Sequence, residues 1–238
     1  EGTKQCLVEH GLSFYIETRK HKLLVDTGAT DAFIQNAETL GIDLSQVDLL
    51  ILSHGHYDHA GGILEFAKKN KTALIYMQKN AVDEYYNTGG EKEKYIGIDN
   101  RIKELSQIVF VDGSLKMDEE LTLFSEVRGR KLFPEGNKCL KCQKGGQFIQ
   151  DDFSHEQYLV ISGSKGKVLV SGCAHNGILN ILERYNDIYG ENPAAVISGF
   201  HMRKKSGYSD LDVELIEQTA RELQKTETMF YTGHCTGE

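Results

Sequence analysis

Short apolar runs separated by polar gaps dominate the hydrophobic pattern of this 238-residue chain. A continuous apolar run of four to eight residues is typical of a buried strand, whereas apolar positions three and four apart indicate a helix. On these criteria, strands are expected at 13–17, 22–26, 47–52, 73–77, 107–112, 121–127, 157–162, 167–171, 194–198 and 228–231. The polar gap between the first two predicts a hairpin.

Helical spacing appears in 31–40, in a segment opened by Gly61-Gly62 that runs to Lys69, in 176–189 and in 209–225. Asp31 and Asn176 are the expected N-caps of two of these helices. Residues 81–100 are polar and rich in tyrosine, which predicts an irregular lid or a helical insertion. Strands followed by strand–helix alternation in both halves predict an α/β fold, an αββα sandwich of two mixed β-sheets flanked by helices. No linker is visible, so one domain is expected over 1–238.

The composition indicates which classes of binding partner and which cellular compartment to expect. The net charge of −8 and a pI near 5.6 disfavour nucleic acid, and no apolar stretch approaches the ~20 residues that span a membrane. Five cysteines, an odd number, favour the reducing cytoplasm. Cys139 and Cys142 form a C-x2-C pair, which is either half of a structural zinc site or two free thiols on an exposed loop. The sequence does not indicate an oligomeric state.

The densest group of metal-competent side chains follows the expected strand at 47–52. It reads H-x-H-x-D-H and contains His54, His56, Asp58 and His59. In an extended segment His54 and His56 project to the same side, and a turn can direct Asp58 and His59 to a second metal. Imidazole nitrogen and carboxylate oxygen favour one or two divalent ions, zinc first, with manganese or iron as alternatives.

Three later histidines share one context. His175, His201 and His234 each follow an apolar strand and have a glycine nearby, which permits a close approach of the backbone. Side chains at strand ends can converge while the sheets hold them in place. We therefore expect these histidines near the H-x-H-x-D-H segment.

These motifs together resemble the metallo-β-lactamase superfamily. The resemblance includes the D-T-G turn at 26–28 and the glycine pair after H-x-H-x-D-H. The segments 9–13, 171–177, 198–201 and 232–237 are similar to a subfamily of metal-dependent hydrolases labelled 7,8-dihydropterin-6-methyl-4-(β-D-ribofuranosyl)aminobenzene-5'-phosphate synthase. The resemblance implies the αββα fold, and also a strand ahead of Glu1, where this chain begins without a methionine.

The resemblance also implies a ligand set. It assigns His54, His56 and a downstream histidine to the first metal, and Asp58, His59 and His234 to the second. His175 is preferred as the downstream histidine, with His155 as the alternative. Cys173 stands where the superfamily's bridging aspartate is expected, so either its thiolate is a ligand or the bridge is lost.

Further roles follow from the chemistry of such a centre. A metal with an open position lowers the pKa of bound water from ~16 toward ~7, and the hydroxide attacks an ester. Asp58 is expected to orient this water and accept its proton, and His201 to be a ligand or an acid/base group. Asp26 is either a group that orients a ligand histidine or a turn cap. The basic cluster Arg203-Lys204-Lys205 follows His201, and its Lys204 and Lys205 are expected to bind an anionic substrate, unless the cluster is a solvated loop.

Three functions remain open from the sequence. The first is a metal-dependent hydrolase that uses a metal-activated hydroxide on a small, phosphorylated ester. The second, implied by the subfamily label, is a synthase that joins a dihydropterin-methyl group to ribofuranosylaminobenzene phosphate. The third is a non-catalytic metal-binding or redox partner protein, which the unusual Cys173 brings into consideration.

Overall fold

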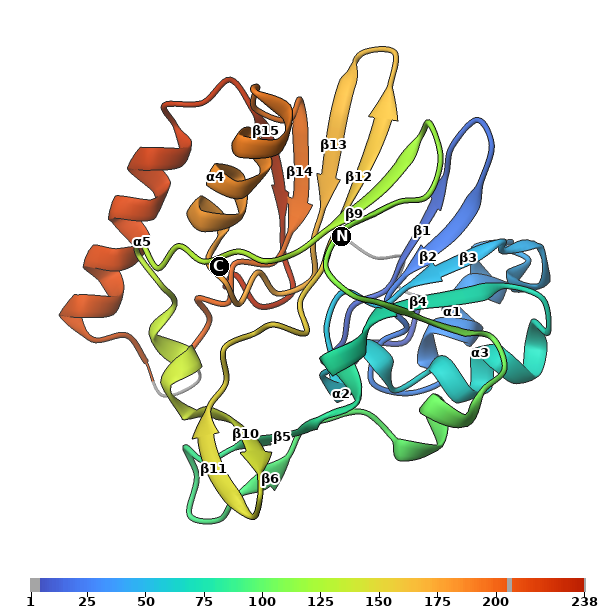
Figure 1. Cartoon of the computed structure of the whole chain (residues 1–238), viewed down its shortest axis with the longest axis horizontal. Helices are drawn as coiled ribbons and strands as arrows, with labels where there is room; N and C mark the ends of the chain where they lie inside the picture. Colours follow the sequence, from blue (N-terminus) through green and yellow to red (C-terminus); the bar gives the residue numbers. More distant parts are fainter. Residues whose placement is uncertain (1–4, 205–206, 238) are drawn as a thin grey trace.

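Two mixed β-sheets face each other at the centre of the computed structural model, which describes residues 5–204 and 207–237 (Figure 1). The first, in the order β1-β2-β3-β4-β7, is formed by Phe14–Glu17, Lys22–Val25, Leu49–Ile51, Leu74–Gln78 and Ile108–Val111. The second, in the order β15-β14-β13-β12-β9-β8, is formed by Met229–Thr232, Ala195–Ser198, Gly166–Val170, Tyr158–Gly163, Leu121–Phe124 and Leu115–Lys116. The expected hairpin is the antiparallel pair β1–β2.

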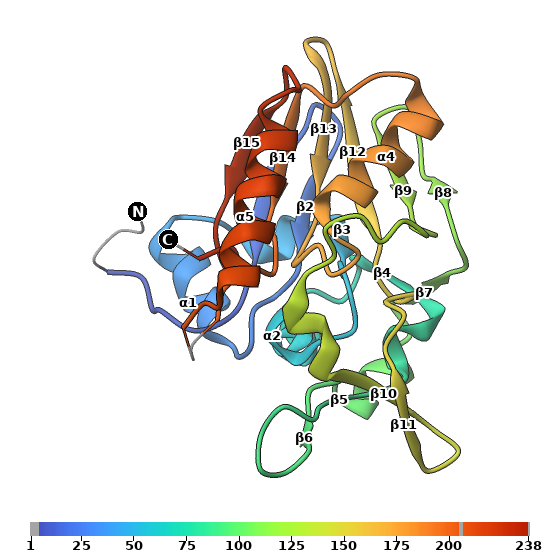
Figure 2. The ribbon, with the colours of Figure 1, turned by 90° about the vertical axis from the view of Figure 1, so that its left-hand side faces the viewer.

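Helices cover the outer face of each sheet. On the first sheet these are α1 (Ala32–Thr39) and α3 (Ile63–Lys69), and on the second they are α4 (Ile178–Tyr189) and α5 (Asp210–Leu223) (Figures 1 and 2). One apolar cluster joins the two sheets, and separate clusters join each sheet to its helices. The expected αββα fold is therefore confirmed. No helix in the described part of the chain is long and apolar enough to cross a membrane.

Parallel strands direct their carboxyl ends to one place. β2, β3, β4 and β7 are parallel in the first sheet, as are β13, β14 and β15 in the second. A parallel connection needs a long crossover, and α1, α3, α4 and α5 supply four of these. The loops that follow the parallel strands therefore gather along one rim of the sandwich.

A third, small sheet contradicts the irregular segment expected at 81–100. Its order is β11-β10-β5-β6, with Gln147–Gln150, Leu140–Lys144, Glu84–Asn87 and Lys94–Tyr95, and it projects from the lower end of the molecule in Figures 1 and 2. Tyr85 of β5 packs in one apolar cluster with Leu140 and Phe153. β5 pairs with β6 on one side and, on the other, with β10, a segment some fifty residues later, so a local pattern could not reveal the whole sheet.

The remaining elements are short: α2 (Tyr57–Ala60) and the 3-10 turns Leu44–Gln46, Lys79–Val82, Asn100–Glu104 and Glu135–Cys139. One expected cap is confirmed in its position and the other is wrong. Asp31 occupies the N-cap position of α1 but accepts no side-chain hydrogen bond there, and the N-cap of α4 is Gly177 rather than Asn176. The Asn176 side chain is bonded elsewhere, as described below.

The D-T-G turn packs directly on the H-x-H-x-D-H segment. The Thr27 N–H donates to the carbonyl oxygen of His59 at 2.7 Å, and the Gly61 N–H donates to that of Gly28 at 2.9 Å. The contact is so close that a Cβ on Gly61 would lie 2.0 Å from the Ala29 carbonyl oxygen. Gly61 is therefore required by close approach of two backbones.

We predict that Gly61→Ala lowers the free energy of unfolding by about 1–3 kcal/mol, because overpacking forces rigid backbone to shift. Gly90→Ala is the matched control, since its nearest contact would be 3.6 Å away. Urea denaturation of both variants measures the effect. Equal stability of the two variants would contradict the prediction, because it would show that the two backbones can move apart without a cost in free energy.

Candidate metal centre

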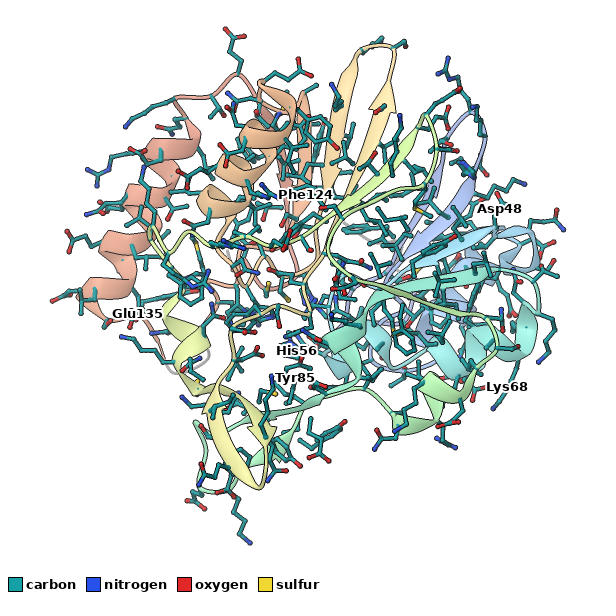
Figure 3. The ribbon with its side chains drawn as sticks, viewed as in Figure 1. Asp48, His56, Lys68, Tyr85, Phe124 and Glu135 are labelled. Atoms are coloured by element: carbon teal, nitrogen blue, oxygen red, sulfur yellow. The ribbon has the colours of Figure 1, made fainter. Side chains whose placement is uncertain are left out.

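The predicted ligands meet at the rim formed by the parallel strands. His54 and His56 follow β3, while Asp58 and His59 lie in α2. Three more loops bring the remaining donors, with Cys173 and His175 after β13, His201 after β14, and His234 after β15. Figure 3 shows His56 at the centre of the molecule, where the two halves meet above the small sheet. Their convergence follows from strand direction, because every one of these loops leaves a parallel strand at its carboxyl end.

The first donor set pairs two imidazoles. The Nε2 atoms of His54 and His175 lie 3.2 Å apart, and the Cys173 sulfur lies within 4.8 Å of both residues' donor atoms. Two nitrogens bound to one zinc at 2.0–2.1 Å in a tetrahedron would be about 3.3 Å apart. The observed separation fits that arrangement without movement of either ring.

A chain of hydrogen bonds fixes the tautomer of His54. The Ser53 hydroxyl donates to Asp26 Oδ2 at 2.7 Å, because a carboxylate can only accept. Ser53 Oγ therefore accepts the proton on Nδ1 of His54 at 2.9 Å. This leaves a lone pair on Nε2, the atom that faces His175.

His59 and His175 are oriented in the same way. His59 donates from Nδ1 to Asp26 Oδ2 at 2.6 Å. Asn137 donates its amide to the His175 carbonyl at 2.7 Å and accepts from His175 Nδ1 at 3.0 Å. Asp26 therefore lies where a group that orients ligand histidines is expected, and Asn137 is a second such residue.

The hydrogen bonds to Nδ1 of His54 and His175 show whether the site can bind a metal ion. With both protons on Nδ1, the Nε2 atoms of His54 and His175 present two lone pairs to each other in a buried site. In the described residues, Nε2 of His56 and of His234 are likewise buried without a hydrogen-bond partner. Buried polar atoms without partners are costly, and cations bound beside these rings would satisfy the nitrogens that carry a lone pair. The residues present therefore fit a metal.

The second donor set contains Asp58, His59, Cys173 and His234, whose donor atoms all lie within 4.8 Å of one another. Asp58 Oδ2 is 3.7 Å from His59 Nε2 and 3.6 Å from His234 Nε2. His59 Nε2 is also 3.2 Å from the Cys173 sulfur. Nitrogen, oxygen and sulfur donors at these separations suit zinc.

His155 has other contacts. Its Nδ1 accepts the Gly55 N–H at 2.9 Å, so its Nε2 carries the proton and faces Asp151 Oδ2 at 3.1 Å. These donor atoms lie near His56. Ligation by His155 would require loss of the Asp151 bond, whereas His175 already faces His54. The geometry favours the preferred downstream histidine, although its role as a ligand stays a prediction.

Burial and nearby charges set the protonation of the ligands. Burial, followed by the neighbouring imidazoles, lowers the pKa of His54 and His175, and burial lowers that of His56 to about 3. Burial also lowers the pKa of His59, but the Asp26 and Asp58 carboxylates outweigh it and raise the value to about 9. Burial raises the pKa of Asp58, yet the surrounding imidazoles hold it below its ordinary value. Three imidazoles are therefore neutral and Asp58 is ionised, as metal ligation requires.

A buried glutamate that the sequence analysis missed shapes the loop that carries His175. Glu156 is 1% exposed, and it accepts the backbone N–H of His175 at 2.7 Å and that of Asn176 at 2.9 Å. It also accepts the Tyr158 hydroxyl and the Asn176 amide. These bonds explain why Asn176 does not cap α4. Its signal in the sequence was a charged residue at the start of an apolar strand.

Backbone strain gathers in the same loops. Asp26, Ala174, His201 and His234 have positive φ angles between 49° and 64°, a region that residues with a side chain seldom adopt. Each lies in a loop that follows a parallel strand; three of these loops carry candidate metal donors, and the fourth carries Asp26, which orients two of the donor imidazoles. Such strain persists only where the surrounding structure fixes it, and it is common at functional sites.

A cavity of about 220 Å³ opens beside the donors. Asp58, Cys173, His175 and His201 line it together with two cations, Arg203 from the basic cluster and Lys94, which the sequence analysis did not assign. His10 also lines it and stacks on His234 with ring centroids 5.1 Å apart.

The expectation for Lys204 needs correction, because its Nζ is bonded to Asp212 Oδ1 at 2.5 Å on the α5 side. Asp212 belongs to the capping box of α5, and the lysine neutralises it there. The neighbouring Arg203 lines the cavity instead. Lys205 lies outside the described residues.

Cys139 and Cys142 gain no further donors within the described ranges. Cys139 donates to the Gly136 carbonyl at 3.2 Å, while Cys142 is buried in β10. Burial raises the pKa of Cys142 to about 11, which keeps it protonated. The expected alternative of an exposed loop is therefore wrong for Cys142, and both thiols are free.

Comparison with known proteins shows which family the chain belongs to. The chain matches the family model of the metallo-beta-lactamase superfamily over residues 7–137. A relative from Methanocaldococcus jannaschii, named 7,8-dihydropterin-6-methyl-4-(beta-D-ribofuranosyl)-aminobenzene-5'-phosphate synthase, is 31% identical over 96% of this chain and 81% of its own.

Two solved structures extend the comparison. Tm1679, described as a metal-dependent hydrolase of the beta-lactamase superfamily, is 31% identical with a TM-score of 0.83, over 100% of this chain and 85% of its own. MEM-A1, a subclass B3 metallo-beta-lactamase from a soil metagenome library, shares the fold at 14% identity and a TM-score of 0.50, over 92% of this chain and 90% of its own.

We predict that protein purified without chelators carries at least about one equivalent of zinc, manganese or iron, since the donor sets are preformed. Asn137→Ala should weaken metal binding by roughly 10–100-fold, because His175 loses the acceptor that orients it. Elemental analysis and competition with a chelator measure both quantities. Well under one equivalent in the unaltered protein would contradict the prediction.

The pKa shifts predict acid lability of the metal-free protein. His54, His56 and His175 are neutral in the fold, but take up protons near pH 6.5 when unfolded, so their stabilisation is lost as the pH falls below that value. His59 acts oppositely, and its contribution is lost as the pH rises through about 9.

Urea denaturation between about pH 7 and about pH 5 should show stability falling with acid. His56→Gln should reduce this slope by up to about 1.4 kcal/mol per pH unit, the value for one proton. An unchanged slope would mean that His56 is not a buried neutral group.

Proposed function

Because the chain belongs to the metallo-β-lactamase superfamily, we propose that it is a metal-dependent hydrolase of a small, phosphorylated ester. The observation that carries the proposal is the pair of Nε2 lone pairs, on His54 and His175, that face each other 3.2 Å apart beside an open cavity. A cation would satisfy both lone pairs, and the adjoining cavity would let a substrate reach that cation.

The charges around the cavity support an anionic substrate. The protein as a whole is acidic, with a net charge of −8, yet Lys94 and Arg203 both line this cavity. The Lys94 ammonium lies 5.0 Å above the ring of Tyr57, which holds its position at the rim. Cations concentrated at a cleft on an acidic surface favour a phosphate group over a neutral ester.

The size of the cavity limits what enters. At about 220 Å³ it is smaller than most small-molecule sites, so it suits a small substrate or the reacting end of a larger one. Ile96 and Leu140, from the segment of the small sheet, provide apolar wall. A phosphate held between cations with an apolar group against this wall would satisfy both surfaces.

A bound divalent metal would lower the pKa of water toward ~7 and polarise the scissile oxygen. Asp58 supports this chemistry because its carboxylate is ionised and lies 12% exposed at the cavity floor, where it can accept a hydrogen bond from water. Asp26, Ser53 and Asn137 hold the ligand imidazoles in one orientation, so little reorganisation is needed. Zinc remains the proposed metal, and the cytoplasm the proposed compartment.

The second candidate is the synthase reaction. The relative from Methanocaldococcus jannaschii that carries this name is 31% identical over 96% of the chain. Both candidates place a phosphorylated molecule against the metal, so the cationic wall suits either. They differ in the acceptor, which is water for the hydrolase and the ribofuranosylaminobenzene phosphate for the synthase.

We predict that Lys94→Gln and Arg203→Gln each raise KM for a phosphorylated substrate by roughly 10–100-fold, as expected for loss of a charge-assisted bond. Both kcat and metal content should change little, since the bond of Arg203 to the Cys235 carbonyl comes from the backbone, which the substitution leaves in place. Lys92→Gln is the matched control, because Lys92 is exposed in the β5–β6 connection, two residues before Lys94, but does not line the cavity. Kinetics with phosphomonoesters, phosphodiesters and cyclic phosphates provide the measurement.

Product analysis separates the two reactions. Metal-loaded protein is incubated with a pterin diphosphate and ribofuranosylaminobenzene phosphate. A joined product supports the synthase, and turnover of the ester panel without joining supports the hydrolase. Absence of both activities in metal-loaded protein would reject both and leave the non-catalytic hypothesis.

A further inference from the structure

A third group of donors lies next to the two described above. It consists of Cys173, Cys235 and His201, whose donor atoms all lie within 4.8 Å of one another. Cys235 follows β15 and had no role in the predicted ligand set. Both cysteines are almost fully buried, at 3% and 6% exposure, and neither is in a disulfide.

The fold holds the Cys235 sulfur against its neighbours. Its Sγ accepts the backbone N–H of His201 at 3.3 Å and lies 3.7 Å from the Cys173 carbonyl oxygen. A Cβ on Gly199 would come within 2.6 Å of this sulfur, so the close packing depends on a glycine at that position. The sulfur is thereby fixed beside Cys173 rather than free to rotate away.

His201 presents a donor that the rest of the protein leaves unsatisfied. Among the described residues, its Nδ1 is buried without a hydrogen-bond partner. The ring lies 4.2 Å from the His175 ring, centroid to centroid, at the edge of the metal centre. Its backbone φ of 49° is the strained conformation that carries the ring to this place.

From this geometry we propose that Cys173, Cys235 and His201 form a third cation position, which takes a thiophilic ion such as Zn²⁺, Cd²⁺ or Cu⁺. Two sulfurs and one imidazole nitrogen exclude magnesium and calcium, which prefer oxygen ligands. Cys173 also belongs to the other two donor sets, so its sulfur is shared with the neighbouring ions.

The position is open toward the cavity. Cys173, Cys235 and His201 all line it, and three protein ligands leave one place of a tetrahedron unfilled. A structural zinc site is normally closed by four protein ligands, whereas an open place admits a substrate atom. The site also favours the role of His201 as a ligand over that as an acid/base group. The inference does not depend on hydrolase or synthase activity.

Cadmium titration of the full-length, reduced and metal-stripped protein tests the proposal. Native mass spectrometry counts the bound ions, while cadmium NMR and near-ultraviolet sulfur-to-metal absorption report the sulfur ligands. About three equivalents are expected for the unaltered protein, one in a sulfur-rich environment. In Cys235→Ser and His201→Gln, the sulfur-rich equivalent should be lost or bound at least ~100-fold more weakly, with about two equivalents retained.

Cys142→Ser is the matched control, because Cys142 is also buried but lies in β10 outside all donor sets. It should bind cadmium like the unaltered protein. Retention of the two other equivalents in Cys235→Ser shows that the variant is folded, and His201→Gln tests the site without removing a thiol. Unchanged stoichiometry and sulfur signal in both variants would overturn the proposal. So would a Cys173–Cys235 disulfide in the native protein whose reduced form takes up no third ion.

Discussion

One buried carboxylate, that of Asp26, connects the parts of the metal centre. It is fully buried, and it accepts the backbone N–H and the hydroxyl of Ser53 together with Nδ1 of His59. Through Ser53 it also sets the tautomer of His54. A buried charge must be satisfied in this way, and satisfying it fixes the lone pairs in both of the main donor sets. The close backbone contact of the D-T-G turn with α2 keeps this network in register.

Cys173 is the residue in which the candidate metal centre departs from the pattern implied by the superfamily resemblance. In place of the bridging aspartate implied by the superfamily resemblance, a sulfur lies between the donors of His54 and His175 on one side and those of Asp58, His59 and His234 on the other. Sulfur is softer than carboxylate, so this exchange favours zinc and other thiophilic ions over magnesium or calcium. Cys235 adds a second sulfur within 4.8 Å of the first. Each cysteine lies in a loop that follows a parallel strand, β13 for Cys173 and β15 for Cys235.

Under the proposed function, the small sheet contributes to substrate recognition and the sandwich holds the metal. The sandwich supplies every candidate ligand, whereas Lys94, Ile96 and Leu140 come from the segments that build the small sheet. Rigid strands position the donors, and a pairing of two distant insertions forms the wall that a substrate would meet. Under the proposed function, a change in these insertions would alter substrate choice and leave the donor sets in place. The 31% identity shared with proteins named as a synthase and as a hydrolase is consistent with that division.

The sequence by itself determined the sandwich and the ligand segment, because strand and helix periodicity is local and H-x-H-x-D-H lies within six residues. It also indicated His175, His201 and His234, since each follows an apolar strand. Only the tertiary structure favours His175 over His155, because that preference depends on which ring faces His54. Asn137, Lys94 and Cys235 had no local signal, and the only signal of Glu156 was its charge ahead of an apolar strand. Their roles arise from contacts between segments far apart in the chain, and the direction of Lys204 toward Asp212 was likewise fixed by packing.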